Sequence, residues 1–295
     1  MTTRPIVLAA AGLLAVSFAA GSLAPSAPPY PPALAVPGYQ VLAADFHVHS
    51  FPLSWSTLSP FETVLEARTQ GLDAIALTGH NNVVVSKLGR WFSRRFGGPI
   101  VLTGEEVHAP SYHMIAVGIE HSIDWRQTAA SAIDEIHRQG GIAIAAHPVA
   151  QYWPGWNAND ATGRLDGSEV VHPVAFTDPQ GRLELRQFFA RRKLTAIGSS
   201  DFHYSSHMGL PRTYVFVTEK SERGVLDALR RGRTVVYDLD GRAFGDADLI
   251  RLGVVPALKA PLPSGLWRRL SLVTGVLGLL LGGAFLCSPS TQLET

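Results

Sequence analysis

Apolar runs alternate with amphipathic segments through the middle of the chain. Four apolar runs are typical of buried strands, at residues 39–47, 72–80, 142–148 and 194–203. Three amphipathic segments predict helices, at residues 59–71, 124–141 and 181–193. In the first of these, Ser59 and Glu62 can form a capping box, and Pro60 suits the first turn. Strands that alternate with helices predict parallel pairing, in an α/β barrel or a doubly wound sheet.

Two uncharged apolar segments flank this region, at residues 5–24 and 270–287. Each is long enough to be expected to cross a bilayer. The stretches just inside them are rich in proline, which is typical of extended linkers. We therefore expect a signal peptide or signal anchor at 1–24, a Pro-rich linker at 25–39, one globular domain at 40–253, a second linker at 254–266, a transmembrane helix at 267–288 and a tail at 289–295.

Charges beside the two apolar segments point to opposite topologies. Arg4 favours an inside amino terminus and an outside domain, whereas Arg268 and Arg269 favour an inside domain. Because the first span usually dominates, we expect a membrane-associated protein with an extracytoplasmic domain. The membrane is then one expected partner.

Composition restricts the candidate chemistry. The net charge is +1 and no run of Lys or Arg suggests a nucleic-acid footprint. The single cysteine, Cys287, rules out an intramolecular disulfide and a cysteine-based zinc site. Any metal must therefore be held by His, Asp and Glu, as suits Zn, Mn, Fe or Mg.

Residues of the kinds that bind metals follow four of the predicted strands. They are His47 with His49, His80, His147, and Asp201 with His203. The carboxyl ends of parallel strands meet at one edge, so these side chains should converge on one pocket. His47 and His49 are two apart, so on a strand both point to the same side. Each histidine alone could equally be a core or loop residue, and only their joint placement predicts a metal site.

An acidic pair and one more histidine lie in a predicted hairpin. Glu105 and Glu106 follow an apolar run, and His113 opens the strand that returns. A buried carboxylate with a histidine across the hairpin suits a ligand that bridges two metals. A surface hairpin with a salt-bridged glutamate is the alternative, and the pattern does not choose between the two acids.

The ordered motifs DFHVHS, LTGHN, GEEV, HMIAVGI, AHP and GSSDFH resemble those of the PHP family, the polymerase and histidinol phosphatase domain family. The resemblance covers roughly residues 41–237. It implies an α/β fold, a distorted (β/α)7 TIM-like barrel, here between N- and C-terminal hydrophobic membrane helices. It also implies two or three divalent ions, Zn, Mn or Fe, and hydrolysis of phosphoesters.

The resemblance carries over to single residues. The implied metal ligands, with Glu106 as the bridging acid, are His47, His49, His80, Glu106, His113, His147, Asp201 and His203. His147 or His203 is expected to protonate the leaving group where it is not committed to metal. Asp45 is expected to orient a ligand histidine through the other ring nitrogen.

Several residues near these motifs have more open roles. Arg212 could hold a phosphate oxygen, with a surface salt bridge as the alternative. Glu169 ends a strand and could be structural. The histidines expected to be structural or solvated are His108, His121, His137 and His172.

Two departures from the family pattern weaken the expected site. No Asp, Glu or His occurs between His49 and Glu62, where the family places an acid or a histidine, and Gly79 replaces another acid. One ion would then be held chiefly by His80, His203 and water. The aromatic insert at 151–160 could wall a substrate pocket or pack as a lid.

The expected activity is hydrolysis of a small phosphorylated substrate by a metal-activated hydroxide. Two alternatives stay open: a catalytically impaired metal-binding sensor or scaffold, and a metal hydrolase that acts on C–N or C–O bonds. The sequence does not indicate the substrate, the metal or the oligomeric state.

Overall fold

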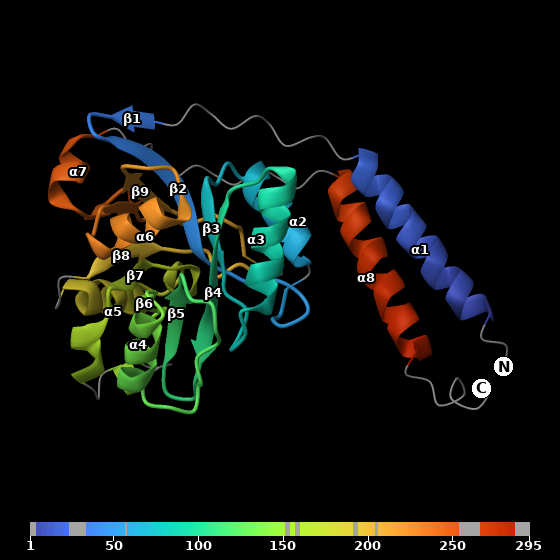
Figure 1. Cartoon of the computed structure of the whole chain (residues 1–295), viewed down its shortest axis with the longest axis horizontal. Coiled ribbons are helices and arrows are strands. Elements are labelled where there is room, and N and C mark those ends of the chain that lie inside the picture. The colour runs from blue at the N-terminus through green and yellow to red at the C-terminus, as the bar shows by residue number, and fades with distance from the viewer. Residues whose placement is uncertain are drawn as a thin grey trace. The chain divides into compact units, whose positions relative to one another are not determined.

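The computed structural model describes residues 4–23, 34–56, 58–150, 154–156, 160–190, 194–203, 206–253 and 266–286. The chain divides into two compact units, one comprising Met1–Pro28 with Leu262–Thr295 and the other Pro29–Pro261 (Figure 1). The larger unit carries every residue that the motifs single out. Most of the predicted linker at 25–39, nearly all of the linker at 254–266, the tail at 289–295 and most of the aromatic insert lie outside the described residues.

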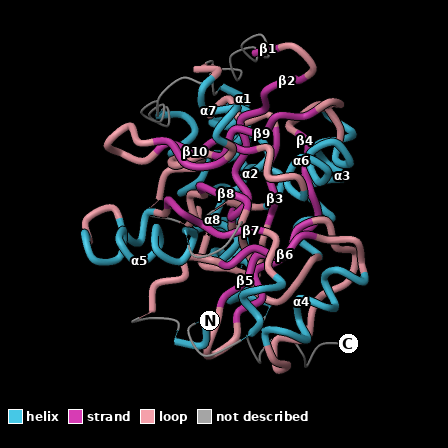
Figure 2. The backbone as a smooth tube through the Cα atoms, turned by 90° about the vertical axis from the view of Figure 1, so that its left-hand side faces the viewer, coloured by secondary structure: helices cyan, strands magenta, loops and turns pink. Residues whose placement is uncertain are grey.

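One mixed sheet of 11 strands, counted over the described residues, organises the larger unit. Its order is β11-β10-β9-β2-β3-β4-β5-β6-β7-β8, and β1 pairs with β2 beside this path. Figure 2 shows the strands running through the middle of the unit, with helices outside them. The strand bounds are β1 Leu34–Val36, β2 Tyr39–Val48, β3 Ala74–Leu77, β4 Ile100–His108, β5 His113–Val117, β6 Ile142–Ala145, β7 Gly167–Val171, β8 Thr195–Gly198, β9 Thr213–Val217, β10 Thr234–Tyr237 and β11 Ala243–Gly245.

Helices pack on the strands that precede or follow them. Contacts join α3 to β4, α4 to β6, α5 to β7 and α6 to β9, while α2 packs against α3. Their bounds are α2 Pro60–Thr69, α3 Val84–Phe96, α4 Ala129–Arg138, α5 Pro179–Ala190, α6 Glu222–Arg230 and α7 Ala247–Arg251, and the short 3-10 helices are η1 Pro154–Trp156, η2 Asp160–Arg164 and η3 Pro173–Ala175.

The predicted capping box at the start of α2 is confirmed. The Glu62 amide donates to Ser59 Oγ at 3.3 Å, and the Ser59 amide donates to Glu62 Oε2 at 2.9 Å. Pro60 is the first residue of the helix, where its missing N–H leaves no hydrogen bond unmade. Local sequence therefore determines where this helix begins.

The predicted (β/α)7 barrel is wrong in its strand directions. β2, β3 and β4 are parallel, as are β6, β7 and β8, but β5 is antiparallel to both its neighbours and β9, β10 and β11 are antiparallel as well. For β5 the reason is the short connection 109–112 after β4, because a parallel crossover needs a dozen residues or more. The sheet also curls until β10 lies against β8, where Thr234 Oγ1 donates to the Ala196 carbonyl at 2.9 Å, so the barrel is nearly closed.

Apolar side chains from β2, β4, β5, β6 and β8 fill the inside of this curled sheet. The cluster includes Phe46, Leu102, Ile115, Ile144 and Ile197, all at most 1% exposed. Burial of each such side chain contributes about 1.5–3 kcal/mol. The packed interior holds the strand ends in fixed positions beneath the candidate site.

The smaller unit consists of two helices, α1 Arg4–Leu23 and α8 Leu266–Leu286, which pack against each other. Ser17 Oγ donates to the Ser271 carbonyl at 2.7 Å, and a Cβ on Gly278 would lie only 2.9 Å from Leu14 Cγ. Within the described part of the chain, no helix has the length and apolar character needed to cross a membrane.

The predicted membrane helices, and with them the membrane-associated location and the membrane partner, are therefore not supported and are corrected here. An apolar run does not by itself tell a bilayer from a protein neighbour. In α1 and α8, part of the apolar surface is covered by the other helix.

Candidate metal centre

The residues singled out by the motifs meet at one end of the sheet. His47, His80 and Glu106 lie at or just past the carboxyl ends of the parallel strands β2, β3 and β4. His147 follows β6 and Asp201 follows β8, and these strands run in the same direction. Since β5 runs the other way, its first residue is at this end too, and that residue is His113.

Glu106 occupies the centre of the cluster. Its Oε2 lies 3.5 Å from Nε2 of both His47 and His49, and 3.2 Å from Nε2 of His80. Its Oε1 lies 2.8 Å from His113 Nδ1 and 3.3 Å from His147 Nε2. Each carboxylate oxygen therefore faces its own group of imidazoles. The neighbouring Glu105 points to the opposite face of β4, where Oε1 accepts the Ile123 amide at 2.6 Å.

Asp201 completes the first of these groups. Its Oδ1 lies 3.2 Å from His47 Nε2 and 3.0 Å from His49 Nε2. His203 stands beside it, with Nδ1 2.9 Å from the Asp201 carbonyl oxygen. That carbonyl can only accept a hydrogen bond, so the proton is on His203 Nδ1 and the lone pair of its Nε2 is available.

These atoms fit the surroundings of a divalent ion. The Nε2 atoms of His47 and His49 are buried and make no hydrogen bond, although carboxylate oxygens lie 3.0–3.5 Å away. Ligands that each lie about 2.0–2.2 Å from one ion are separated by roughly 3 Å or a little more. Buried nitrogens that face oxygens without a hydrogen bond are best explained as ligands of a shared cation.

Charge within the cluster supports the same interpretation. Burial lowers the pKa of His47, but the carboxylates of Asp201, Glu169 and Glu106 outweigh it and hold that pKa well above its usual value. Burial raises the pKa of Glu106, and the nearby histidines, His47 first, bring it well below its usual value. The carboxylates therefore favour a positive charge beside His47, and a bound metal ion would supply that charge in place of a proton on His47.

Glu169 has a larger part in the cluster than the sequence indicated. It is fully buried on β7, its Oε1 lies 3.0 Å from His47 Nδ1, and its Oε2 accepts the His147 amide at 2.6 Å. A carboxylate on Nδ1 leaves the proton there and directs Nε2 toward Glu106 and Asp201. The signal in the sequence was a carboxylate inside an otherwise apolar strand.

Asp45 does not contact a histidine ring in the way expected from the sequence. Its carboxylate accepts the backbone amides of His47, Ser200 and Gly209 at 3.3, 3.1 and 2.8 Å. Burial raises the pKa of Asp45 to about 6. Asp45 therefore ties β2 to the segment after β8, and the ring contact expected of it is made by Glu169.

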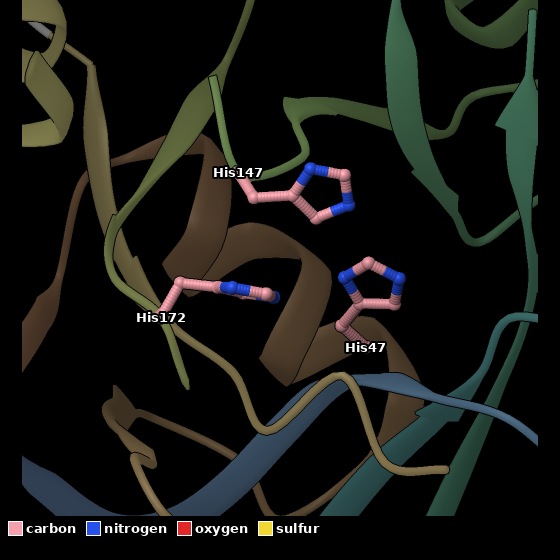
Figure 3. A group of neighbouring side chains, drawn as sticks. All are labelled: His47, His147 and His172. Carbon is pink, nitrogen blue, oxygen red and sulfur yellow. The ribbon is translucent and has the colours of Figure 1, made fainter. Parts of the chain in front are cut away.

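His172, expected to be structural or solvated, lies against the cluster. Figure 3 shows the rings of His47, His147 and His172 gathered around one space. The Val174 amide donates to His172 Nδ1 at 3.1 Å, so the neutral ring carries its proton on Nε2. Burial lowers the pKa of His172 to about 4, which keeps the ring neutral. Its Nε2 lies 3.6 Å from Asp201 Oδ2, so it is suited to face that carboxylate as a donor rather than to bind metal.

Backbone strain is concentrated at the site. Of the described residues, the non-glycine positions with positive φ are Asn81 at 52°, His147 at 28° and Asp201 at 45°. Such conformations cost about 1–3 kcal/mol each and persist where the surroundings impose them. Two of the three are predicted ligands, and the third directly follows His80.

Ser54 lies where the motifs lack an acid. Its Oγ is 3.1 Å from His49 Nδ1 and accepts the His80 amide at 3.2 Å. The neighbouring Trp55 is 76% exposed. The neutral hydroxyl of Ser54 thus contacts His49 and His80, in the segment where the PHP family pattern places an acid or a histidine.

A cleft of about 320 Å³ opens onto the cluster. It is lined by His80, Glu106, His108, His113, His147, Val174, Asp201 and His203. Arg212, a candidate for phosphate binding, is not among the lining residues, and its Nε donates to the Gly209 carbonyl at 2.9 Å. His108, expected to be structural or solvated, is among them.

Two sequence comparisons relate this chain to known proteins. A family model described as PHP-associated matches residues 183–234. An uncharacterized protein of Methanocaldococcus jannaschii is 26% identical over 143 residues, which cover 44% of this chain and 82% of that protein.

Solved structures give a similar result. A two-domain protein from Bacteroides vulgatus, described as containing a predicted PHP-like metal-dependent phosphoesterase, superposes with a TM-score of 0.58 at 26% identity, covering 74% of this chain and 71% of that one. A proposed metal-dependent phosphoesterase from Bifidobacterium adolescentis gives a TM-score of 0.48 at 20% identity, covering 68% and 98%. The PHP-associated segment and the likeness to a predicted PHP-like phosphoesterase support a PHP-type domain in this chain, as its sequence motifs predicted.

Proposed function

We propose that this chain is a metal-dependent phosphoesterase, acting as a phosphatase or phosphodiesterase. The observation that carries the proposal is the position of Glu106, whose two oxygens face two different groups of imidazole nitrogens. A carboxylate placed in this way is suited to bridge two divalent ions, the arrangement typical of two-metal hydrolysis. The PHP-like phosphoesterase from Bacteroides vulgatus supports the same reaction class.

Two sets of ligands follow from these contacts. One set comprises His47, His49, Glu106 and Asp201, and the other comprises Glu106, His113 and His147. His80 and His203 stand beside His49 and can hold a further ion. Imidazole-rich sets favour Zn, Mn or Fe over Mg or Ca.

Bound ions would supply a water of lowered pKa and neutralise charge on the phosphoryl oxygens. The protein residues orient this chemistry. Glu169 holds the His47 ring so that Nε2 faces the cluster, and the complete burial of His47 and His49 keeps bulk water from that side.

Where it does not bind an ion, His203 is placed to protonate the leaving oxygen. It lines the cleft, and its Nδ1 is held by the Asp201 carbonyl, so Nε2 is directed elsewhere. Burial lowers the pKa of His203, but its contacts with Asp201 outweigh this and raise it above the usual value. A raised pKa favours the protonated imidazole that a general acid requires. His147 is less suited, because its Nε2 already faces Glu106 at 3.3 Å.

The lining residues and the volume of the cleft indicate which substrates it suits. Neither Lys nor Arg is among the described residues that line it, so among these the charge of a phosphate would be met by bound ions and histidines. Its volume suits a small phosphorylated compound or the end of a larger one. Arg212 is not assigned a part in binding.

Elemental analysis and a phosphoester panel on the same metal-loaded sample test this function. We expect at least two ions per chain and turnover of an aryl phosphate or an aryl phosphodiester. Glu106→Gln should lower kcat/KM at least about 100-fold, because the bridging charge is lost. Glu105→Gln is the matched control, since this neighbour faces away from the cluster, and it should retain activity.

Other outcomes would contradict the proposal in different ways. Bound metal with no turnover on the whole panel would indicate a sensor or scaffold. Cleavage of esters or amides without phosphoester hydrolysis would indicate action on C–O or C–N bonds.

A further inference from the structure

His108 stands at the mouth of the cleft, beside residues already assigned to the centre. It is the last residue of β4 and lies two positions after Glu106, so both side chains are on the same face of the strand. The centroid of its ring lies 3.9 Å from that of His113 and 4.6 Å from that of His80. Glu106 and His108 thus repeat at the end of β4 the spacing of His47 and His49 at the end of β2.

Asn81 fixes the backbone of His108. Its Oδ1 accepts the His108 amide at 2.8 Å, and its Nδ2 donates to the His108 carbonyl at 3.2 Å. The Asn81 amide also donates to the Glu106 carbonyl at 2.9 Å. Asn81 makes these bonds from a left-handed backbone conformation, with φ of 52°. Asn81 therefore keeps a strained backbone conformation while it holds His108 beside its own neighbour, His80.

We propose that His108 is a metal ligand and that, with His80 and Glu106, it holds a divalent ion at the mouth of the cleft. The ligand atoms of these three residues lie within 4.8 Å of one another, so small rotations of the two rings would bring them around one ion. Two imidazoles and a carboxylate suit Zn, Mn or Fe rather than Mg.

A ligand at this position would compensate for the acid or histidine that the chain lacks between His49 and Glu62. Ser54 offers only a hydroxyl beside His49 and His80, and the lone pair of a hydroxyl binds cations less strongly than a carboxylate. His108 supplies an imidazole nitrogen, a stronger ligand, and the centroid of its ring lies 4.6 Å from that of His80. The inference rests on the proposed metal centre, but not on the reaction that the centre catalyses.

Metal titration of the full chain tests the assignment. We compare wild type with His108→Phe, which keeps a ring against His113 but removes the ligand nitrogen. The number of tightly bound Zn²⁺ or Mn²⁺ ions per chain should fall by one, or the affinity of the weakest ion should fall at least about tenfold. The matched control is His121→Phe, an exposed histidine outside the cleft, which should bind metal as wild type does.

A second pair of variants detects ligation directly. His108→Cys should place a thiolate on the ion, so titration with Cd²⁺ should produce an ultraviolet thiolate-to-metal absorption band. His121→Cys should produce no band beyond that of wild type, which shares Cys287. This measurement does not depend on activity or on a loss of binding.

The outcomes separate this inference from the proposed function. If His108→Phe binds as many ions as wild type with equal affinity and His108→Cys gives no band, His108 is not a ligand, while the main centre stands. If wild type binds no divalent ion at all, both the centre and this inference are overturned.

Discussion

At the residue scale, the hydrogen-bond partner of each ring decides its role. A histidine whose Nδ1 is held by an acceptor, as His47 is by Glu169 and His203 by a carbonyl, keeps a lone pair on Nε2. His172 is the reverse case, because an amide donates to its Nδ1 and the proton is on Nε2. Identical side chains are thereby divided into ligands and a donor.

This division predicts the behaviour of His172 variants. His172→Asn retains an acceptor for the Val174 amide but removes the Nε2 proton that faces Asp201. We expect metal affinity to fall about 10–100-fold, because residues that orient a ligand have effects of this size. His172→Gln, whose amide can reach as a donor, should recover part of the loss.

Isothermal titration with Zn²⁺ or Mn²⁺ checks this, alongside thermal melting of the metal-free proteins. If both variants lose affinity equally, the donor role is refuted. If the loss follows a fall in the melting temperature of the metal-free protein, His172 is merely structural.

Single-residue chemistry was partly visible in the sequence. The motifs named the eight residues that the fold brings together, because paired histidines and strand-end acids are unusual in apolar surroundings. The contacts that Asp45, Glu169, His108 and His172 make were not visible in the sequence. Their partners lie on other strands, and no spacing along the chain encodes such contacts.

At the element scale, the β4–β5 hairpin positions the bridging acid. Gly104 lies opposite Val117, and a Cβ at this glycine would lie 2.5 Å from the Ala116 carbonyl oxygen. The two strands can pair closely only because this position lacks a side chain. Two residues after Gly104, this pairing sets Glu106 opposite Ile115, and the Glu106 carboxylate reaches Nδ1 of His113 at 2.8 Å.

Gly104→Ala should therefore destabilise the domain by about 1–3 kcal/mol, as overpacking does, and weaken metal binding too. Urea unfolding and metal titration of the same variant measure both effects. Gly167→Ala on β7 is the milder comparison, because its Cβ would lie 3.1 Å from the nearest oxygen, the Thr195 carbonyl. An unchanged unfolding midpoint for Gly104→Ala would disprove the close-packing argument.

Elements themselves were predicted well where the signals are local. The capping box of α2 and the strand before each ligand group are present where the pattern placed them. Strand direction was not predicted correctly, since β5, β9 and β11 run opposite to the parallel strands. Direction depends on which strands become neighbours.

At the scale of the whole molecule, the centre couples metal binding to stability. The proposed ligands lie on β2, β4 and β5 and on the segments after β2, β3, β6 and β8, and they meet only when the sheet is folded, so an ion should bind the folded state far better than the unfolded one. At a concentration 100 times its dissociation constant, one ion adds about 2.7 kcal/mol.

Saturation with Zn²⁺ or Mn²⁺ should therefore raise the melting temperature by roughly 5–10 °C, and a chelator should reverse the rise. Differential scanning calorimetry of wild type and Glu106→Gln measures the effect. The variant should show a much smaller rise. An equal rise in both proteins would mean that the ions bind elsewhere.

The sequence by itself determined the resemblance to the PHP family, the alternation of strands and helices and the set of candidate ligands. These are properties of local pattern and of residue type. Tertiary structure decided the mixed, nearly closed sheet, the packing of α1 on α8 in place of membrane spans, and the partner of each histidine ring. The physical reason is that burial and hydrogen-bond partners come from residues distant in the chain, so they are established only when the strands assemble.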